Sequence, residues 1–248
     1  MKLKVILNDA MRFAVSDWYN FLVLGVILLL VDHLIDLSAP SLIDGLWDIL
    51  LVLVIIFLSF IEVGYGFRIV EETVEGSGRP PGFHNLRNLF WHGIKESLVL
   101  IAYFIIPLIL AVFGISEFVE LINLDLSPLI TDYALVLAII FFLCFNIILQ
   151  GAILTMAHHE GSIRSGFNLP LVFRKIRKVG LKNMLIVSII TTVVLYIVKQ
   201  IIFDTLHGLP YPESMVSEII STLIIAPFLM IFTTRLVGLI DVPVDGTD

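Results

Sequence analysis

The chain has 248 residues, 58% of them hydrophobic and 15% charged, with a mean hydropathy of +1.03 and a net charge of −7. This apolar fraction excludes an ordinary soluble domain, and the negative charge argues against a nucleic-acid-binding protein. The one cysteine, Cys144, excludes a disulfide framework. We therefore expect a polytopic membrane protein with a single domain over residues 1–248.

Six apolar runs follow one another along the chain, each near the length that spans a bilayer. Helices are their expected form, because the runs lack the alternation of barrel strands and a backbone in lipid must satisfy its own hydrogen bonds. Pro107 and Pro227 should bend the third and sixth runs. The runs are Tyr19–Leu37, Leu46–Phe67, Ser97–Ser116, Tyr133–Ala157, Asn183–Phe203 and Ile219–Thr234.

Basic residues are distributed asymmetrically around these runs. If the N-terminus is cytoplasmic, every Lys and Arg except Lys199 falls on the cytoplasmic side, and the external connections carry acidic residues but no Arg. We therefore expect a multi-pass protein of the cell membrane with cytoplasmic N- and C-termini. The cytoplasmic cations would be Lys2, Lys4, Arg12, Arg68, Arg79, Arg87, Lys95, Arg164, Arg174, Lys175, Arg177, Lys178, Lys182 and Arg235.

A short pattern recurs before the first, third and fifth runs. Asp17–Leu24, Gly93–Leu100 and Gly180–Val187 align without a gap, and a segment with apolar residues at helical spacing precedes each. An in-plane amphipathic helix followed by a transmembrane hairpin returns to its starting side, so three such units would be parallel repeats. Generic likeness between apolar segments is the alternative. The expected all-α fold has six transmembrane helices in units 1–76, 77–165 and 166–241.

Three stretches of the sequence carry a resemblance: SDWYNFLVLG, GYGFRIVEETVEGSGRPPGFHNLRNLFWHGIK and AHHEGSIRSGFNLPLVFRKIR. They resemble a group of archaeal and some bacterial polytopic membrane proteins, the domain-of-unknown-function family four-thousand-thirteen. A tryptophan that the family often carries after its Pro and Phe is replaced here by Leu86 and Leu89. The resemblance implies an archaeal-type membrane protein and no reaction. Its most specific residues are Gly64, Tyr65, Arg68, Phe83, Gly93 and Lys95.

Polar residues near the hydrocarbon are the first candidates for chemistry. The uncharged stretch between Asp48 and Glu62 is shorter than a full span, so Glu62 should lie in or near the hydrocarbon. Glu62 could line a polar site with Tyr65 and Arg68. Alternatively, its carboxylate could snorkel to the interface or form a structural pair with Lys95.

A second pair of polar candidates lies on the fourth run. Asn146 and Gln150 are four residues apart and share a helix face that should turn inward. Contact between helices and a substrate site are both compatible with this spacing. His158 and His159 are adjacent, so their side chains diverge on a helix and do not form a chelating pair. We expect no metal site, no cofactor and no catalytic residue.

A cluster of cations lies in the third amphipathic segment. Val172, Phe173 and Ile176 are apolar and fall on another helix face from the cations. This segregation is typical of a helix that lies on a membrane and contacts anionic lipid headgroups, rather than of a nucleic-acid site. The expected headgroup contacts are Arg174, Lys175, Arg177 and Lys178.

Three classes of function fit these observations. The favoured class is a non-enzymatic membrane protein that organises lipid, or a membrane-protein partner, at the cytoplasmic leaflet. The second is a transporter or permeation protein with a polar cavity near Glu62, Asn146 and Gln150. The third is a membrane-embedded lipid enzyme, which is disfavoured because no acid and base residues have a suitable spacing.

Overall fold

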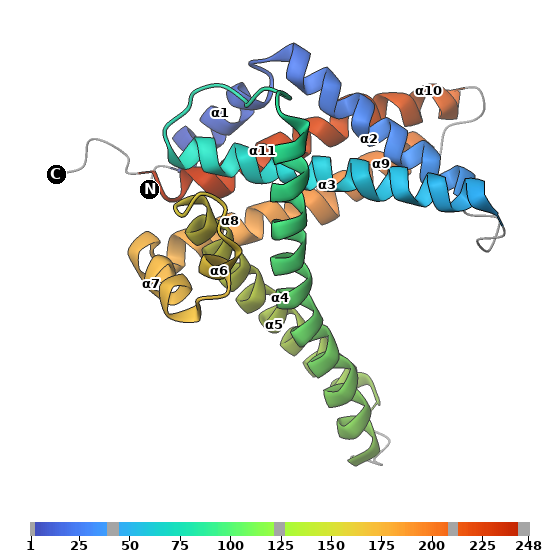
Figure 1. Cartoon of the computed structure of the whole chain (residues 1–248). Coiled ribbons are helices and arrows are strands. Elements are labelled where there is room, and N and C mark those ends of the chain that lie inside the picture. Colours follow the sequence, from blue (N-terminus) through green and yellow to red (C-terminus); the bar gives the residue numbers. More distant parts are fainter. Residues whose placement is uncertain (1–2, 39–44, 122–126, 208–212, 243–248) are drawn as a thin grey trace.

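The computed structural model describes residues 3–38, 45–121, 127–207 and 213–242. Every regular element within these ranges is a helix (Figure 1). Four long helices form two hairpins, namely α2 (Trp18–Ser38), α3 (Leu46–Val74), α4 (Leu86–Leu121) and α5 (Ser127–Ala157). The all-helical expectation is confirmed for this part of the chain.

The third hairpin is interrupted by π-helical turns. Its first arm consists of α8 (Leu181–Thr192), the π-helical η1 (Val193–Val198) and α9 (Lys199–His207). Its second arm consists of α10 (Glu213–Ile220), the π-helical η2 (Ser221–Ile225) and α11 (Ala226–Leu239). Pro227, expected to bend this run, lies at the start of α11 directly after η2, where its missing N–H removes a helical hydrogen bond. Pro107 lies outside the described side chains.

Five helices in the described ranges are long and apolar enough to cross a membrane, and they indicate a multi-pass membrane protein. The remaining expected run, Ser97–Ser116, lies in α4, whose side chains are described only as far as Ile105. The five are Trp18–Ile35, Leu46–Val74, Ile140–Ala157, Leu181–Phe203 and Ser221–Leu239.

Three short helices, the α3–α4 connection and the end of α11 gather at one end of the molecule, which we call the base. The base comprises α1 (Leu3–Ala14), the α3–α4 connection, α6 (Ile163–Gly166), α7 (Leu169–Val179) and the end of α11 (Figure 1). From there, α2, α3, α9 and α10 extend in one direction, and the α4–α5 hairpin projects in another.

Burial follows the same division. Buried apolar side chains such as Ala10, Phe67, Leu154 and Leu236 form the core at the base. Along the first half of α3, by contrast, apolar side chains such as Leu53 are exposed. An exposed apolar helix surface of this kind is expected where lipid rather than protein surrounds the helix. The base is therefore the part of the chain in which side chains determine a specific arrangement.

Glycines with positive φ lie where several helices end. Gly76 after α3 and Gly161 after α5 both have positive φ, as does Gly180 between α7 and α8. A positive φ is accessible to glycine without a Cβ clash, so it redirects the chain at low cost. The Asn168 side chain caps α7 by accepting from the N–H of Leu171 at 3.4 Å.

One expected element differs from the structure. The second amphipathic segment, around Leu86 and Ile94, is not a separate in-plane helix, because α4 continues from it into the apolar run without a break. Gly93 lies within this helix and adopts no positive φ. It packs instead against α3, as described below.

Candidate functional site

The α3–α4 connection folds back over α3 at the base. The Phe83 ring stacks on Tyr65 with their centroids 4.1 Å apart, and the Phe83 N–H donates to Asn20 Oδ1 at 3.3 Å. Arg68 Nη1 donates to the His84 carbonyl at 3.3 Å. Tyr65 and Arg68, both expected in a polar intramembrane site, therefore hold this connection against α3, and Asn20 holds it against α2.

The crossing of α3 and α4 depends on two glycines. A Cβ on Gly64 would collide with the Leu89 carbonyl, and a Cβ on Gly93 would collide with the Phe60 carbonyl. Backbones that approach this closely require small residues at the contact. Gly64 and Gly93 are among the residues most specific to the family resemblance, and helix packing explains why glycine is required at both positions.

The other predicted intramembrane candidates fall into two local groups. On α3, Glu62 is half-buried, and Arg68 forms an ion pair with Glu72, one turn farther along, at 3.2 Å. On α5, Gln150 Nε2 donates to Asn146 Oδ1 at 3.0 Å. Gln150 Oε1 is buried and has no hydrogen-bond partner among the described residues. Asn146 and Gln150 thus bond to each other on α5, and one Gln150 acceptor remains available.

Glu96 is a buried acid that sequence reasoning missed. It lies one residue before the expected span Ser97–Ser116, its side chain is 7% exposed, and its Oε2 has no partner within the described ranges. His92, one helical turn earlier on α4, also has a buried and unpartnered Nδ1. Burial raises the pKa of Glu96 and lowers the pKa of His92, so both neutral forms are favoured. The signal available in the sequence was the spacing of four residues between His92 and Glu96, which places both on one helix face.

A buried arginine joins three segments of the base. Arg235 on α11 donates from Nε to Asp9 Oδ1 at 3.1 Å, and from Nη1 to Thr73 Oγ1 at 3.0 Å and to the Ser77 carbonyl at 2.7 Å. Its guanidinium also lies 4.1 Å from the centroid of the Phe13 ring. The sequence identified Arg235 only as one of many cytoplasmic cations, because its partners lie far away along the chain.

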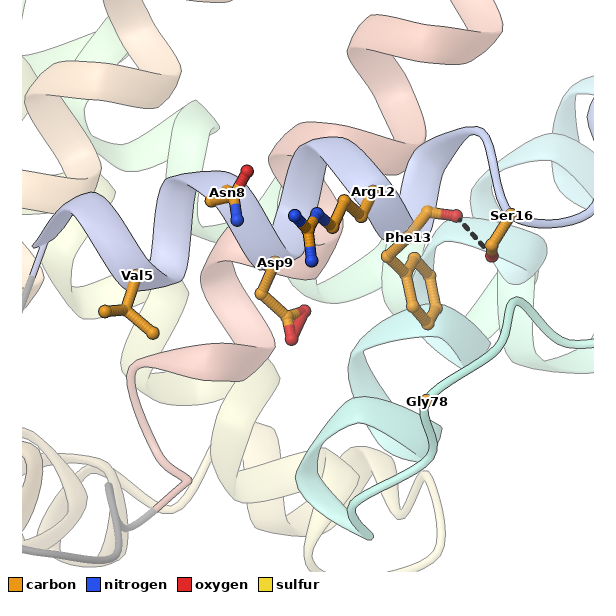
Figure 2. Close-up of a pocket in the computed structure, with 7 residues that line it drawn as sticks. All are labelled: Val5, Asn8, Asp9, Arg12, Phe13, Ser16 and Gly78. Carbon is orange, nitrogen blue, oxygen red and sulfur yellow. Dashed lines mark hydrogen bonds between the residues drawn. The ribbon is translucent and has the colours of Figure 1, made fainter.

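A hollow of about 320 Å³ lies beside α1 and the α3–α4 connection (Figure 2). Asp9 and Arg12 contribute opposite charges to it, and Asp9 is already bound by Arg235. The Ser16 hydroxyl donates to the Phe13 carbonyl at 2.8 Å. This mixed lining does not favour an ion of either sign. The lining residues are Val5, Asn8, Asp9, Arg12, Phe13, Ser16 and Gly78.

A second hollow, of about 150 Å³, has a one-sided charge and lies between the end of α5 and α7. We call it the α5–α7 hollow. Gly151 brings the two helices together, because a Cβ there would crowd the side chains of Val172 and Ile176. These two residues belong to the buried face of α7. The lining residues are Thr155, His158, His159, Leu171, Arg174, Lys175 and Lys178.

The cations of this hollow differ in their partners. Lys175 forms an ion pair with Asp241 at 2.5 Å, and His158 Nε2 contacts the same carboxylate oxygen. Burial lowers the pKa of Lys175, and the Asp241 carboxylate opposes this effect. Arg174 and Lys178 form no ion pair with any described residue. The hollow therefore keeps two uncompensated positive charges.

The four predicted headgroup contacts thus occupy different environments. Arg174, Arg177 and Lys178 are exposed, whereas only 10% of the Lys175 side chain is exposed. Lys175 connects α7 to Asp241, and the other three cations face outward. This arrangement can bind an anion. No group of three metal-ligating side chains occurs within the described ranges.

Comparison with known proteins gives one match. A family model described as "Protein of unknown function (DUF4013)" matches residues 49–205, more than half of the chain. No curated protein and no solved structure matches the chain. The expected family resemblance is therefore confirmed, and it assigns no activity to the α5–α7 hollow.

Proposed function

The chain belongs to the DUF4013 family of proteins of unknown function, and we propose that it is a non-enzymatic membrane protein that binds anionic lipid headgroups at the cytoplasmic leaflet. The observation that carries this proposal is the division of α7 into three faces. Val172, Ile176 and Val179 form a face buried in the protein. The other two faces are exposed and differ in chemistry.

The exposed faces of α7 suit the interface of a bilayer. Leu169 and Phe173, one turn apart, are each 47% exposed, which is unfavourable for apolar side chains in water. Arg174, Arg177 and Lys178 are exposed on the same short helix. Apolar side chains that enter the acyl boundary, together with cations at the level of the phosphates, are the features of an interfacial helix.

The position of the base supports the proposed orientation. Described cations such as Arg12, Arg79, Arg164 and Arg235 belong to its helices and connections, whereas the opposite connections have few basic residues. Under the positive-inside rule the base then faces the cytoplasm. This orientation places α7 against the leaflet that carries most of the anionic lipid.

The packing of the base also supports three parallel repeats. The segment α1 packs on α11, the start of α4 packs on α3, and α7 packs on α5. In each case the segment that begins one proposed unit contacts the second hairpin helix of the preceding unit, and α1 closes the cycle. We infer that units 1–76, 77–165 and 166–241 surround an axis near the membrane normal.

Spin labels on the full-length protein test the position of α7. Single cysteines in a Cys144→Ser background would replace Leu169, Phe173 and Lys178 in turn, in nanodiscs that contain anionic lipid. We expect labels at 169 and 173 to be accessible to oxygen in the acyl region, and the label at 178, on the other exposed flank, to be accessible to a water-soluble relaxation agent. Equal exposure of all three labels to water would contradict the proposal.

Lipid composition near α7 provides the second measurement. Replacement of Arg174 and Lys178 by Gln should reduce the enrichment of anionic lipid around the protein, because each removed cation weakens attraction by about 1 kcal/mol near an anionic surface. Both the parent protein and the 174/178 variant carry a fluorescent label at position 177. Energy transfer from this label to an anionic lipid probe reports the enrichment in each protein. A zwitterionic probe is the control.

A permeation function is the second candidate, and one observation favours it. Glu96 and Gln150 each have a buried oxygen without a partner among the described residues. Buried unpaired polar atoms are costly and recur at ion or proton pathways. Flux of protons or cations into protein-containing vesicles, lost in Glu96→Gln at unchanged stability, would support this function over lipid binding alone.

A further inference from the structure

We propose that the α5–α7 hollow is a binding site for one terminal phosphate group, as in a phosphomonoester headgroup or inorganic phosphate, with Arg174 and Lys178 as its charged ligands. The site deepens the proposed function and rests on it in one respect, because a headgroup reaches the hollow only if α7 lies at the membrane surface. The proposal differs from a general attraction between α7 and anionic lipid. It assigns specific binding to two of the exposed cations and not to the third.

Helix geometry separates these cations. Arg174 and Lys178 are four residues apart and share the flank of α7 that also contributes Leu171 and Lys175 to the hollow. Arg177 is equally charged and exposed but does not line the hollow. Successive residues on a helix turn by about 100°, which places Arg177 on the flank of Phe173. The same helix therefore provides both the site and a matched control.

The charge of the hollow is suited to a phosphate. Lys175 and Asp241 form an ion pair, and His158 contacts the same carboxylate, so this group is close to neutral. Arg174 and Lys178 have no acidic partner in the described part of the chain. Two unpaired cations match the one to two negative charges of a phosphate, and the planar arginine fork can bind two of its oxygens.

His159 adds a ring nitrogen to a hollow whose lining surface is mostly apolar. Its Nδ1 lies 2.7 Å from the Thr155 carbonyl, which can only accept a hydrogen bond, so Nδ1 carries a proton. The Nε2 atom is then the ring nitrogen that remains for a ligand. It can accept from a protonated phosphate oxygen, or donate when the imidazole is charged. The volume of about 150 Å³ is several times the roughly 30 Å³ of one water in the liquid, so the hollow can hold a group larger than water.

A phosphate could reach this position as part of a lipid headgroup or as a free ion. Native mass spectrometry of the full-length protein in detergent micelles separates these sources. One arm adds phosphatidic acid, a second adds phosphatidylcholine, and a third adds inorganic phosphate alone. The measured quantity is the dissociation constant of each ligand for wild type and variants. Melting temperatures establish that each variant folds.

We expect wild type to bind phosphatidic acid saturably at one site, and the double variant Arg174→Gln with Lys178→Gln to weaken this binding by about tenfold or more, because two charge-assisted hydrogen bonds are lost. Arg177→Gln should change it by less than about twofold, as expected for a cation outside the site. Asp241→Asn should strengthen binding, since it frees the charge of Lys175. Inorganic phosphate that binds with the same dependence on these variants would also support the site and would identify a free ion as its source.

Equal effects of Arg174→Gln, Lys178→Gln and Arg177→Gln would overturn the site, while the general attraction of α7 to anionic lipid would still stand. Equal affinity of wild type for phosphatidic acid and phosphatidylcholine, with no binding of inorganic phosphate, would also overturn it. The spin-label positions on α7 are independent of these constants. Failure of the proposed membrane contact is therefore distinguishable from failure of the phosphate site.

Discussion

Arg235 and Asp9, separated by 226 residues in the sequence, form an ion pair at 3.1 Å that connects α11 to α1. The same guanidinium donates to Thr73 and to the Ser77 carbonyl, so one side chain also secures the end of α3. Because α1 and α11 come from opposite ends of the chain, this pair joins the first and last described helices at the base.

Replacement of Arg235 by Gln should lower the free energy of unfolding by about 3 kcal/mol, since Asp9 and the Ser77 carbonyl would lose a buried cationic partner. A double-mutant cycle with Asp9→Asn, measured by thermal unfolding in detergent micelles, isolates the pair. We expect the double variant to be more stable than the sum of the single losses predicts. Strict additivity would show that the two side chains are not coupled.

The glycine contact between α3 and α4 gives a second prediction. Gly64→Ala should destabilise the protein by about 1–3 kcal/mol, because its Cβ would press on the Leu89 carbonyl and separate the helices. Gly78→Ala is the matched control, since nothing lies within 4 Å of its Cβ position. Thermal midpoints in the same detergent compare the two variants. If both changed stability equally, the close crossing would be wrong.

Two substitutions of Tyr65 distinguish a packing role of its ring from a polar role of its hydroxyl. Its ring stacks on Phe83, but its hydroxyl is buried without a partner among the described residues. Tyr65→Phe should therefore leave stability within about 0.5 kcal/mol, and Tyr65→Ala should cost about 3–5 kcal/mol. A large loss in Tyr65→Phe, measured by the same unfolding assay, would reveal a hydrogen bond and return Tyr65 to the polar candidates.

Local sequence signals predicted much of the helical arrangement. Apolar runs predicted the long helices, and Gly76, Gly161 and Gly180, all with positive φ, lie where helices end. These features depend on neighbours along the chain, so local sequence is sufficient to locate them. Gly93 shows the limit of such signals, because it lies inside α4 and its role at a helix crossing depends on the distant Phe60.

The candidate site was predicted less completely because its charge depends on distant partners. The amphipathic pattern identified Arg174, Lys175, Arg177 and Lys178, but it could not show that Lys175 binds Asp241. This pair joins α7 to the end of α11, and no helical spacing encodes it. Which cations of α7 line the α5–α7 hollow therefore depends on tertiary contacts and not on local sequence.

The expected topology leads to a prediction about accessibility. In a Cys144→Ser background, Gly78→Cys at the base should be protected from an impermeant reagent added outside intact cells, and Gly45→Cys at the far end of α3 should react. Both glycines are exposed in the structure, so access rather than burial decides the result. The control is permeabilised cells, in which both should react. The reverse pattern in intact cells would invert the proposed orientation.

Glu96 gives a prediction about pH. Burial raises its pKa to about 8 from the ordinary 4.5, so between these values the folded protein keeps a proton that the unfolded chain has released. Stability from this group is therefore complete below about pH 4.5 and is lost as pH rises towards 8.

Glu96→Gln should remove this pH dependence, because an amide preserves shape without ionising. The free energy of unfolding of the variant minus that of wild type should therefore be larger at pH 8 than at pH 5. The charged groups that act on the neighbouring His92 are Lys95 and Arg68, so Lys95→Gln serves as a control for a change in local charge. Unfolding in detergent at both pH values provides the comparison. Parallel pH profiles for wild type and Glu96→Gln would contradict the prediction. They would show that Glu96 is ionised in the folded protein, stabilised by water or by a cation that reaches it from the base. Glu96 would then be a charged member of a hydrated site rather than a neutral buried acid.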